Sequence, residues 1–142
     1  MNQSLSIDQI SLGQIYETQI EVDHGRIAAF AEATGDNNPI HFDDEAAAQS
    51  IFGRRVAQGM LTAGFLSGVF GTQFPGYGTV YLSQSVKFLR PVFLGDTVTL
   101  RFKVLEVLAE KNRLRVETIG LNQAGQEVMT GEAVVMPPKK KD

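Results

Sequence analysis

The chain has 142 residues, a formal net charge of -3 and a pI of about 5.4, and it contains no cysteine. This length predicts a single domain, residues 1–142, with a core large enough to need no disulfides, and the lack of cysteine excludes thiolate metal sites. The negative charge disfavours nucleic-acid binding through phosphate neutralisation, while the absence of a secretory pattern and of a membrane-spanning apolar run leads us to expect a cytoplasmic protein.

A strand over residues 14–20 is the first predicted element, and a helix follows it. Asp23 suits the N-cap of this helix because its carboxylate can accept hydrogen bonds from the free N–H groups of the first turn. Apolar residues then recur at helical spacing as far as Thr34. Gly35 ends the predicted helix, since glycine readily adopts the left-handed backbone that follows a helix C-terminus.

A short helix is predicted next, over residues 45–49, with Asp43 or Asp44 as its cap and Gly53 at its end. The adjacent pair Arg54-Arg55 follows this helix. We expect the pair to be exposed and solvated, and contact with a substrate phosphate is the alternative interpretation.

Residues 58–71 are apolar on nearly every side, which predicts a buried helix. Gly64, Gly68 and Gly71 fall at spacings of four and three. Each costs about 1 kcal/mol of helix propensity relative to alanine, which is tolerable where another element must approach the helix closely. We therefore expect a sheet wrapped around this helix.

Long strands with alternating apolar residues dominate the second half of the chain. They are predicted over residues 79–90, 97–104, 114–121 and 127–135, with a hairpin turn at 122–125 and a flexible tail over 136–142. In the first of these strands, the residues expected to face the core are Val80, Leu82, Val86 and Phe88. Helices followed by antiparallel strands predict an α+β fold with a helix packed on the sheet.

The segment between the first two helices, residues 34–41, carries the side chains best suited to chemistry. Asp36 and His41 are of the residue types that share proton transfer near neutral pH. Pro39 disfavours helical backbone at Asn38, so the two groups lie on a shaped loop rather than on a helix. The alternative is structural, because Asp-Asn-Asn-Pro also makes a stable turn and a histidine after a turn is usually a surface residue.

Gly59 begins the predicted buried helix, where free N–H groups and the helix dipole favour negative charge. It is therefore a candidate oxyanion site, and the alternative is a turn glycine. Ser67, two turns further along, is interpreted as a small residue for close packing, and Gln84 as a hydrogen-bonded core amide. No metal site is predicted, because the polar cluster around His41 offers one imidazole and no recognised spacing.

These residues lie in a longer pattern that resembles a known family. Ala33-Thr34-Gly35-Asp36-Asn37-Asn38-Pro39-Ile40-His41 is similar to the hydratase 2 motif of the MaoC-like (R)-specific enoyl-CoA hydratases. The resemblance covers roughly residues 15–135 and extends through Gly59-Met60-Leu61-Thr62-Ala63, Tyr81-Leu82-Ser83-Gln84 and Arg90-Pro91-Val92-Phe93-Leu94-Gly95-Asp96. Within the family, the chain looks most like the short, single-domain PhaJ-type enzymes that supply polyhydroxyalkanoate synthesis.

The resemblance implies a hot-dog fold, in which an antiparallel sheet wraps a long central helix. It also implies a homodimer with a continuous sheet and an active site near the subunit interface. Asp36 and His41 match the catalytic dyad of the family, and Gly59 matches the glycine whose N–H binds the thioester oxygen. Ser67 matches a serine that supports the catalytic region, and Asn38 is expected to support the loop.

The implied activity is the reversible, (R)-specific hydration of trans-2-enoyl-CoA to (R)-3-hydroxyacyl-CoA, within fatty-acid metabolism. The acyl-CoA is the substrate, and neither a metal nor a further cofactor is expected. One departure is Gln58, because the family often has histidine before the motif glycine, and a glutamine can donate a hydrogen bond but cannot titrate. A hot-dog thioesterase, a 3-hydroxyacyl-carrier-protein dehydratase and a non-enzymatic acyl-thioester-binding module are the alternatives, and acyl chain length and pathway are left open.

Overall fold

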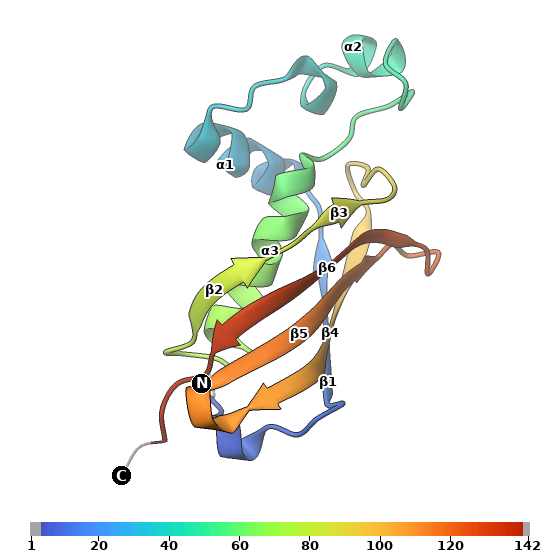
Figure 1. The fold of residues 1–142 in the computed structure, drawn as a ribbon. Helices are drawn as coiled ribbons and strands as arrows, with labels where there is room; N and C mark the ends of the chain where they lie inside the picture. Colours follow the sequence, from blue (N-terminus) through green and yellow to red (C-terminus); the bar gives the residue numbers. More distant parts are fainter. Residues whose placement is uncertain (1–3, 141–142) are drawn as a thin grey trace.

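The computed structural model describes residues 4–140, and residues 1–3 and 141–142, which include the end of the expected tail, lie outside the described residues. Six antiparallel strands form one sheet in the order β1-β4-β5-β6-β2, with β3 also paired to β6 (Figure 1). The strands are β1 (Ile15–Glu21), β2 (Val80–Gln84), β3 (Lys87–Phe88), β4 (Thr97–Leu108), β5 (Arg113–Leu121) and β6 (Glu127–Met136).

Three α-helices complete the α+β fold. They are α1 (His24–Thr34), α2 (Asp44–Ala48) and α3 (Gly59–Thr72), and short 3-10 turns lie at Ile7–Gln9, Pro39–His41 and Ala109–Lys111. α3 packs against the sheet, while α1, α2 and the loop between them lie beyond its N-terminal end (Figure 1). No helix in residues 4–140 is long and apolar enough to cross a bilayer.

α1 begins and ends where the sequence predicts. The Asp23 carboxylate accepts a hydrogen bond of 2.8 Å from the Arg26 N–H, so the side chain satisfies a first-turn donor that has no partner within the helix. At the other end Gly35 adopts a φ of 81°, and its N–H donates to the Ala31 carbonyl. The chain leaves the helix at this glycine and enters the polar loop.

α2 is capped by Asp43, whose carboxylate accepts hydrogen bonds from two backbone N–H groups of the first turn. The helix ends at Ala48, so the prediction that Gly53 ends it was wrong. A turn at Ser50 ends the helix before Gly53. The Ser50 hydroxyl donates to the Ala47 carbonyl at 2.6 Å and accepts a hydrogen bond from the backbone N–H two residues further on.

The core lies between α3 and the central strands. Leu66, Val69 and Phe70 of α3 pack there with the inward-facing residues of β4, which are, as the alternation predicts, Val98, Leu100, Phe102 and Val104. The Phe70 ring centroid lies 5.0 Å from that of Phe102 and 5.1 Å from that of Tyr81, with interplanar angles of 81° and 66°. Edge-to-face contacts of this kind add to the burial energy, so Phe70 joins α3 to both β4 and β2.

The glycines of α3 do not face the sheet. A methyl group built at Gly64, Gly68 or Gly71 would meet no atom within 4 Å, and Gly64 and Gly68 are exposed. The expectation that the sheet approaches the helix at these glycines was therefore wrong. The sheet covers the large apolar side chains on the opposite side of α3, and the glycine face is left open in a single chain.

The strand predicted over residues 79–90 is broken into β2 and β3. A bulge just after Tyr81 shifts the register between β2 and β6. Because one extra residue reverses which side chains face inward, Tyr81 faces the core before the bulge and Val86 faces it after the bulge. The predicted inward face is therefore confirmed for Val86 and was wrong for Val80, Leu82 and Phe88, which are 49%, 44% and 47% exposed. Tyr81 packs against the core instead, and burial raises its pKa to about 12.

Gln84 is the hydrogen-bonded amide that the sequence predicts. Its Nε2 donates to Thr118 Oγ1 at 2.9 Å, and its Oε1 accepts a hydrogen bond from the Tyr81 hydroxyl. Since β6 lies between β2 and β5 in the sheet, this network joins strands that are not direct neighbours. The polar side chain therefore serves the packing of the sheet.

The end of the chain is paired further than expected. β6 extends to Met136, which pairs with Val80, and the Pro137 carbonyl accepts a hydrogen bond of 2.9 Å from the Asn112 side chain. The tail expected to begin at residue 136 therefore starts no earlier than Pro138. β6 ends directly before Pro137, which has no backbone N–H to donate to the sheet, so the two prolines end the strand as the sequence predicts.

We expect Phe70→Ala to lower the free energy of unfolding by about 3–5 kcal/mol, because it leaves a cavity between α3 and β4. Urea unfolding followed by circular dichroism measures this change. Leu12→Ala is the matched control, since Leu12 is exposed and its truncation should change stability by less than about 0.5 kcal/mol. Equal effects of the two substitutions would contradict the assigned core.

Candidate active site

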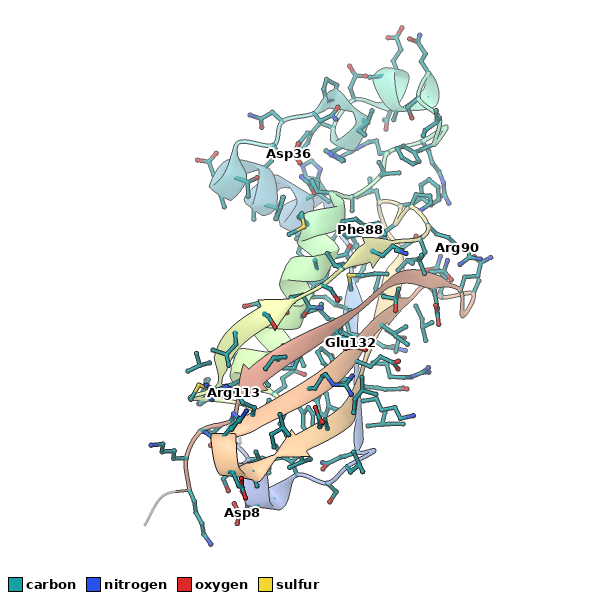
Figure 2. The ribbon with its side chains drawn as sticks, in the orientation of Figure 1. Asp8, Asp36, Phe88, Arg90, Arg113 and Glu132 are labelled. Atoms are coloured by element: carbon teal, nitrogen blue, oxygen red, sulfur yellow. The ribbon has the colours of Figure 1, made fainter. Side chains whose placement is uncertain are left out.

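The loop that carries Asp36 and the start of α3 lie at one end of the molecule (Figures 1 and 2). Figure 2 shows Asp36, Phe88 and Arg90 toward the end that carries α1 and α2, while Arg113 and Asp8 lie toward the opposite end. α3 begins at the same end as Asp36, so the polar loop and the free N–H groups of a helix N-terminus are brought into one region (Figures 1 and 2).

Hydrogen bonds within the loop shape the backbone around Asp36 and Asn38. Thr34 Oγ1 accepts from the Asp36 N–H at 3.2 Å, and Asp36 Oδ1 accepts from the Asn38 N–H at 3.4 Å. Asn38 Oδ1 caps the 3-10 turn that begins at Pro39, accepting from a backbone N–H at 3.3 Å. Short polar side chains after a helix end thus build successive turns, and His41 is the last residue of the final turn.

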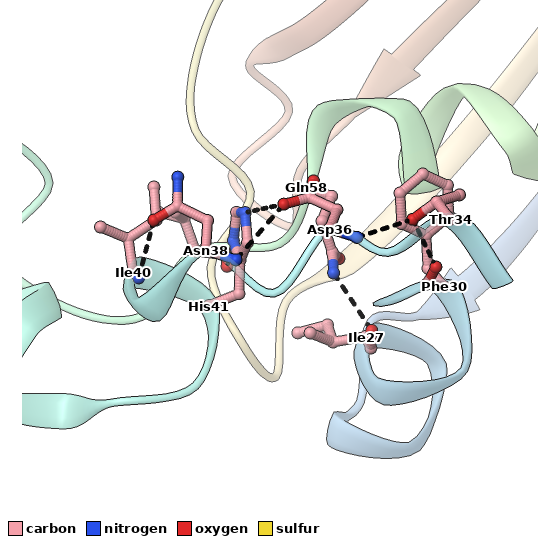
Figure 3. Close-up of polar contacts among 9 residues, drawn as sticks. Ile27, Phe30, Thr34, Asp36, Asn38, Ile40, His41 and Gln58 are labelled. Atoms are coloured by element: carbon pink, nitrogen blue, oxygen red, sulfur yellow. Dashed lines mark hydrogen bonds and ion pairs between the residues drawn. The ribbon is translucent and has the colours of Figure 1, made fainter. Parts of the chain in front are cut away.

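The two side chains expected to form a dyad converge. Asp36 Oδ1 lies 4.0 Å from His41 Nε2, and Figure 3 shows the carboxylate facing the imidazole. The side chain of His41 is 7% exposed and that of Asp36 is 41% exposed. The imidazole is therefore buried, whereas the carboxylate is accessible to solvent. The nearby Asp43 is taken up in capping α2, and within residues 4–140 no group of three or more His, Asp and Glu side chains is arranged to hold a metal ion.

A backbone contact fixes the His41 ring. Its Nδ1 lies 2.7 Å from the carbonyl oxygen of Val56. Because a carbonyl oxygen only accepts hydrogen bonds, Nδ1 carries the proton, and Nε2 of the neutral ring keeps its lone pair. That lone pair is on the side of the ring that faces Asp36. Two proton acceptors placed in this way can take a proton from a water molecule between them.

Arg55 holds the backbone of the same histidine. Its Nε donates to the His41 carbonyl at 2.8 Å, and its Nη2 lies 3.1 Å from His24 Nδ1. The expectation that both members of the Arg54-Arg55 pair are solvated was therefore wrong for Arg55, which is half-buried. Arg54 is exposed as predicted, and its guanidinium carbon lies 3.8 Å from the centroid of the Phe93 ring.

Gly59 is the first residue of α3, and its backbone N–H has no hydrogen-bond acceptor within residues 4–140. It borders a cavity of about 350 Å³, whose lining also includes Phe52, Val56, Thr62, Phe88, Arg90 and Met129. A methyl group built at Gly59 would lie 3.1 Å from the Phe88 ring, so glycine permits the ring to lie this close. A free N–H at a helix N-terminus beside an apolar cavity can bind a developing oxyanion. Asp36 and His41 do not line this cavity, although Val56 connects it to the imidazole.

Two buried polar side chains lie on either side of Gly59 in the sequence, Gln58 just before α3 and Thr62 in its first turn. Gln58 Nε2 donates to the Ile27 carbonyl at 3.1 Å, which connects the start of α3 to α1. Gln58 thus provides a hydrogen-bond donor at the position where the family often has histidine. Gln58 Oε1 and Thr62 Oγ1 are buried with no partner within residues 4–140. Thr62 was not predicted as part of the region, because one threonine in an apolar helix gives no signal beyond its four-residue spacing from Gln58.

Ser67 is not brought to the dyad. It is exposed and lies about 12 Å along α3 from Gly59, at the rise of an ideal helix. It lines a second cavity of about 370 Å³ together with Met60, Gly64 and Tyr81. This cavity opens on the glycine face of α3, and the supporting role of Ser67 stays a prediction.

Residues 9–125 match the model of a family described as MaoC like domain. The chain belongs to the MaoC-like family. An (R)-specific enoyl-CoA hydratase of Rhodospirillum rubrum is 39% identical over 133 residues, which are 94% of this chain and 92% of that protein. The residues around the dyad and Gly59 therefore lie inside the region that this MaoC-like chain shares with the hydratase.

Solved structures of two (R)-hydratases resemble the MaoC-like chain. That of Pseudomonas aeruginosa, in its unliganded form, has a TM-score of 0.93 and 40% identity, covering 98% of this chain and 89% of its own. That of Aeromonas caviae, described as involved in PHA biosynthesis, has a TM-score of 0.87 and 39% identity, covering 91% of this chain and 98% of its own. The expected hot-dog fold is confirmed, with α3 as the central helix packed against the six-stranded sheet.

We expect neutral His41 to carry its proton on Nδ1. Long-range proton–nitrogen NMR spectra at about pH 8.5, where a free imidazole is neutral, distinguish the two tautomers. His24 is the only other histidine, so the His41→Ala spectrum assigns the signals. A neutral His41 protonated at Nε2 would contradict the hydrogen bond to the Val56 carbonyl.

Proposed function

We propose that this MaoC-like protein catalyses the reversible, (R)-specific hydration of a trans-2-enoyl-CoA to an (R)-3-hydroxyacyl-CoA. The observation that carries the proposal is the 4.0 Å approach of Asp36 Oδ1 to His41 Nε2 in a chain of this family. The likeness to the (R)-specific enoyl-CoA hydratase of Rhodospirillum rubrum supports the substrate class and the stereochemistry. The free N–H of Gly59, beside an apolar cavity, supports the placement of the thioester.

The dyad is spaced to hold one water molecule. A water oxygen about 2.8 Å from both Asp36 Oδ1 and His41 Nε2 would see the two atoms at an angle of about 90°, which suits the two O–H bonds of water. Both acceptors then engage hydrogens of the water. A lone pair of the water oxygen is left free to attack C3 of the enoyl group.

The addition forms a C3–O bond while Asp36 or His41 takes a proton from the water. The electron pair of the C2–C3 double bond moves toward the thioester carbonyl, whose oxygen accepts a hydrogen bond from the Gly59 N–H. A proton delivered by the same pair to C2 completes the step, so one water is consumed and neither a metal nor a redox cofactor enters the balance. Positioned acid–base groups contribute about 10²–10⁴-fold, and one oxyanion donor about 10²–10³-fold.

We propose a homodimer as the assembly that carries out this reaction. Its support is the open surface of the single chain. β2 is the edge strand of the sheet, and Val80, Leu82 and Phe88 expose apolar side chains on β2 and β3. The glycine face of α3 lies open beside this edge, around the cavity that Ser67 lines. Exposed apolar edges promote unwanted pairing unless they are covered, and a second copy paired edge to edge covers both surfaces.

We propose a cytoplasmic location and a role in supplying (R)-3-hydroxyacyl-CoA to polyhydroxyalkanoate synthesis. The cysteine-free composition supports the location. The likeness to the Aeromonas caviae hydratase, described as involved in PHA biosynthesis, supports the role.

Asp36→Asn and His41→Ala should each lower the turnover number for crotonyl-CoA by at least about 10²-fold. The asparagine keeps the Oδ1 atom that accepts the Asn38 N–H, so the loop is retained while the proton acceptor is lost. Asp44→Asn, at an exposed acid in the first turn of α2, is the matched control and should keep nearly the full rate.

Loss of the enoyl absorbance measures hydration in this experiment, and a thiol reagent measures release of free CoA. Near-normal hydration by both dyad variants would refute the assigned mechanism. Release of CoA with the double bond intact would identify a thioesterase instead. Binding of the thioester with neither change would identify a binding module.

Leu82→Glu should convert the proposed dimer into a monomer, because it places a charge in an apolar contact. Sedimentation velocity at micromolar concentration measures the change in mass. Leu12→Glu is the control, since it adds the same charge at an exposed residue outside the β2–β3 edge and should leave the dimer intact. A monomeric wild type, or equal mass for both variants, would contradict the proposed interface.

A further inference from the structure

Two arginines lie near the N-terminus of α3, one lining the cavity that Gly59 borders and both lining the neighbouring cavity. Arg90 lines the cavity at Gly59, of about 350 Å³, and also the neighbouring one of about 320 Å³, which Arg54 lines with it. Arg90 and Pro91 line both cavities. The cavities therefore lead from the N-terminus of α3 to two guanidinium groups, and Figure 2 shows Arg90 beside Phe88 at this end of the molecule.

Neither guanidinium group is neutralised by an acid. Arg54 is held over the Phe93 ring, and Arg90 Nη1 donates to the Glu127 carbonyl at 2.7 Å. Among residues 4–140, no carboxylate oxygen lies within 4.0 Å of a nitrogen of either arginine. A guanidinium has five N–H donors, so both arginines keep donors for a ligand. Arg55 is not part of this pair, because it is bound to the His41 carbonyl.

Two acids belong to the same region, and neither cancels the positive charge. Asp96 lines the cavity of about 320 Å³ but is buried, and its carboxylate accepts from the Phe93 N–H and from the Gln123 side chain, at 2.9 Å each. Glu127 is exposed and contacts Arg90 through its backbone. In a chain with a net charge of -3, two unpaired arginines beside one cavity are a local excess of positive charge.

We infer that Arg54 and Arg90 form a phosphate-binding subsite for the coenzyme A part of the thioester. The inference rests on the proposed function, since the acyl end must lie at Gly59 for the remainder of the molecule to extend toward Arg90. Guanidinium groups bind phosphate oxygens in pairs and are more weakly hydrated than ammonium groups, which suits a diphosphate at an exposed cavity edge. A thioester of pantetheine carries no phosphate, so the subsite distinguishes it from the CoA thioester.

Arg54→Gln and Arg90→Gln, combined in one variant, test the subsite. We expect the KM for crotonyl-CoA to rise about 10- to 30-fold with kcat unchanged, and the KM for crotonyl-pantetheine to equal that of wild type. Added salt should raise the KM for crotonyl-CoA in wild type and have little effect in the variant. Arg113→Gln is the control, because it makes the same kind of substitution and removes one positive charge at the opposite end of the molecule, and it should behave as wild type (Figure 2).

An unchanged KM for crotonyl-CoA, or an equal loss with both thioesters, overturns the subsite. A loss confined to crotonyl carried on acyl carrier protein also overturns it and assigns the arginines to a carrier protein. Calorimetry with free coenzyme A separates this inference from the proposed function. Weaker binding of coenzyme A by the double variant, but not by Arg113→Gln, supports the subsite even where neither thioester is hydrated.

Discussion

The hydrogen bond from His41 Nδ1 to the Val56 carbonyl is the contact on which the candidate site depends. It fixes the orientation of the ring and its tautomer together, because the carbonyl accepts the only proton of the neutral imidazole. A ring free to turn would present either nitrogen to Asp36. Because Nδ1 lies 2.7 Å from the Val56 carbonyl oxygen, the lone pair of Nε2 faces the Asp36 carboxylate, and no second contact is needed to orient the ring.

The hydrogen bond to Val56 belongs to a set of backbone contacts that joins segments separated in the sequence. The Val56 N–H donates to the Ile40 carbonyl at 3.3 Å, and the Ala57 N–H donates to the Val92 carbonyl at 2.7 Å. Val56 also forms a bridge with Phe93, just before β4. The segment that leads into α3 is therefore bound to the polar loop on one side and to the approach to β4 on the other. The dyad, the free N–H of Gly59 and the arginines of the proposed subsite are therefore connected through this hydrogen-bonded segment.

Local chemistry explains which features the sequence predicted well. The caps of α1 depend on Asp23 and Gly35 alone, and the buried face of β4 follows from strict alternation. The polar loop was predicted because Pro39 restricts its neighbour and short polar side chains close turns. The nearness of Asp36 to His41 was a consequence of these same local rules, since both residues lie within one short loop.

Long-range geometry explains what the sequence did not predict. The bulge in β2 appears only in its pairing with β6, so the alternation of residues 79–90 predicted the inward position of Val86 correctly and those of Val80 and Leu82 wrongly. The Val56 carbonyl is a backbone group, and no residue type marks it as the partner of His41. Arg54 and Arg55 are adjacent in sequence and look alike, yet only the fold turns one toward the histidine and leaves the other at the cavity edge.

α3 combines three roles. The free energy gained by burying its apolar side chains, compared with the helix-propensity cost of its glycines, explains its composition. Its N-terminus presents the Gly59 N–H, one side buries Leu66 and Phe70, and another side exposes Gly64 and Gly68. Each internal glycine costs about 1 kcal/mol of helix propensity, whereas each fully buried large apolar side chain contributes about 1.5–3 kcal/mol. The core side therefore outweighs the glycines, so the helix persists with a smooth face at which Gly64 and Gly68 are exposed in the described part of the chain. Small residues on that face suit close approach by another backbone, which is what the proposed second copy would bring.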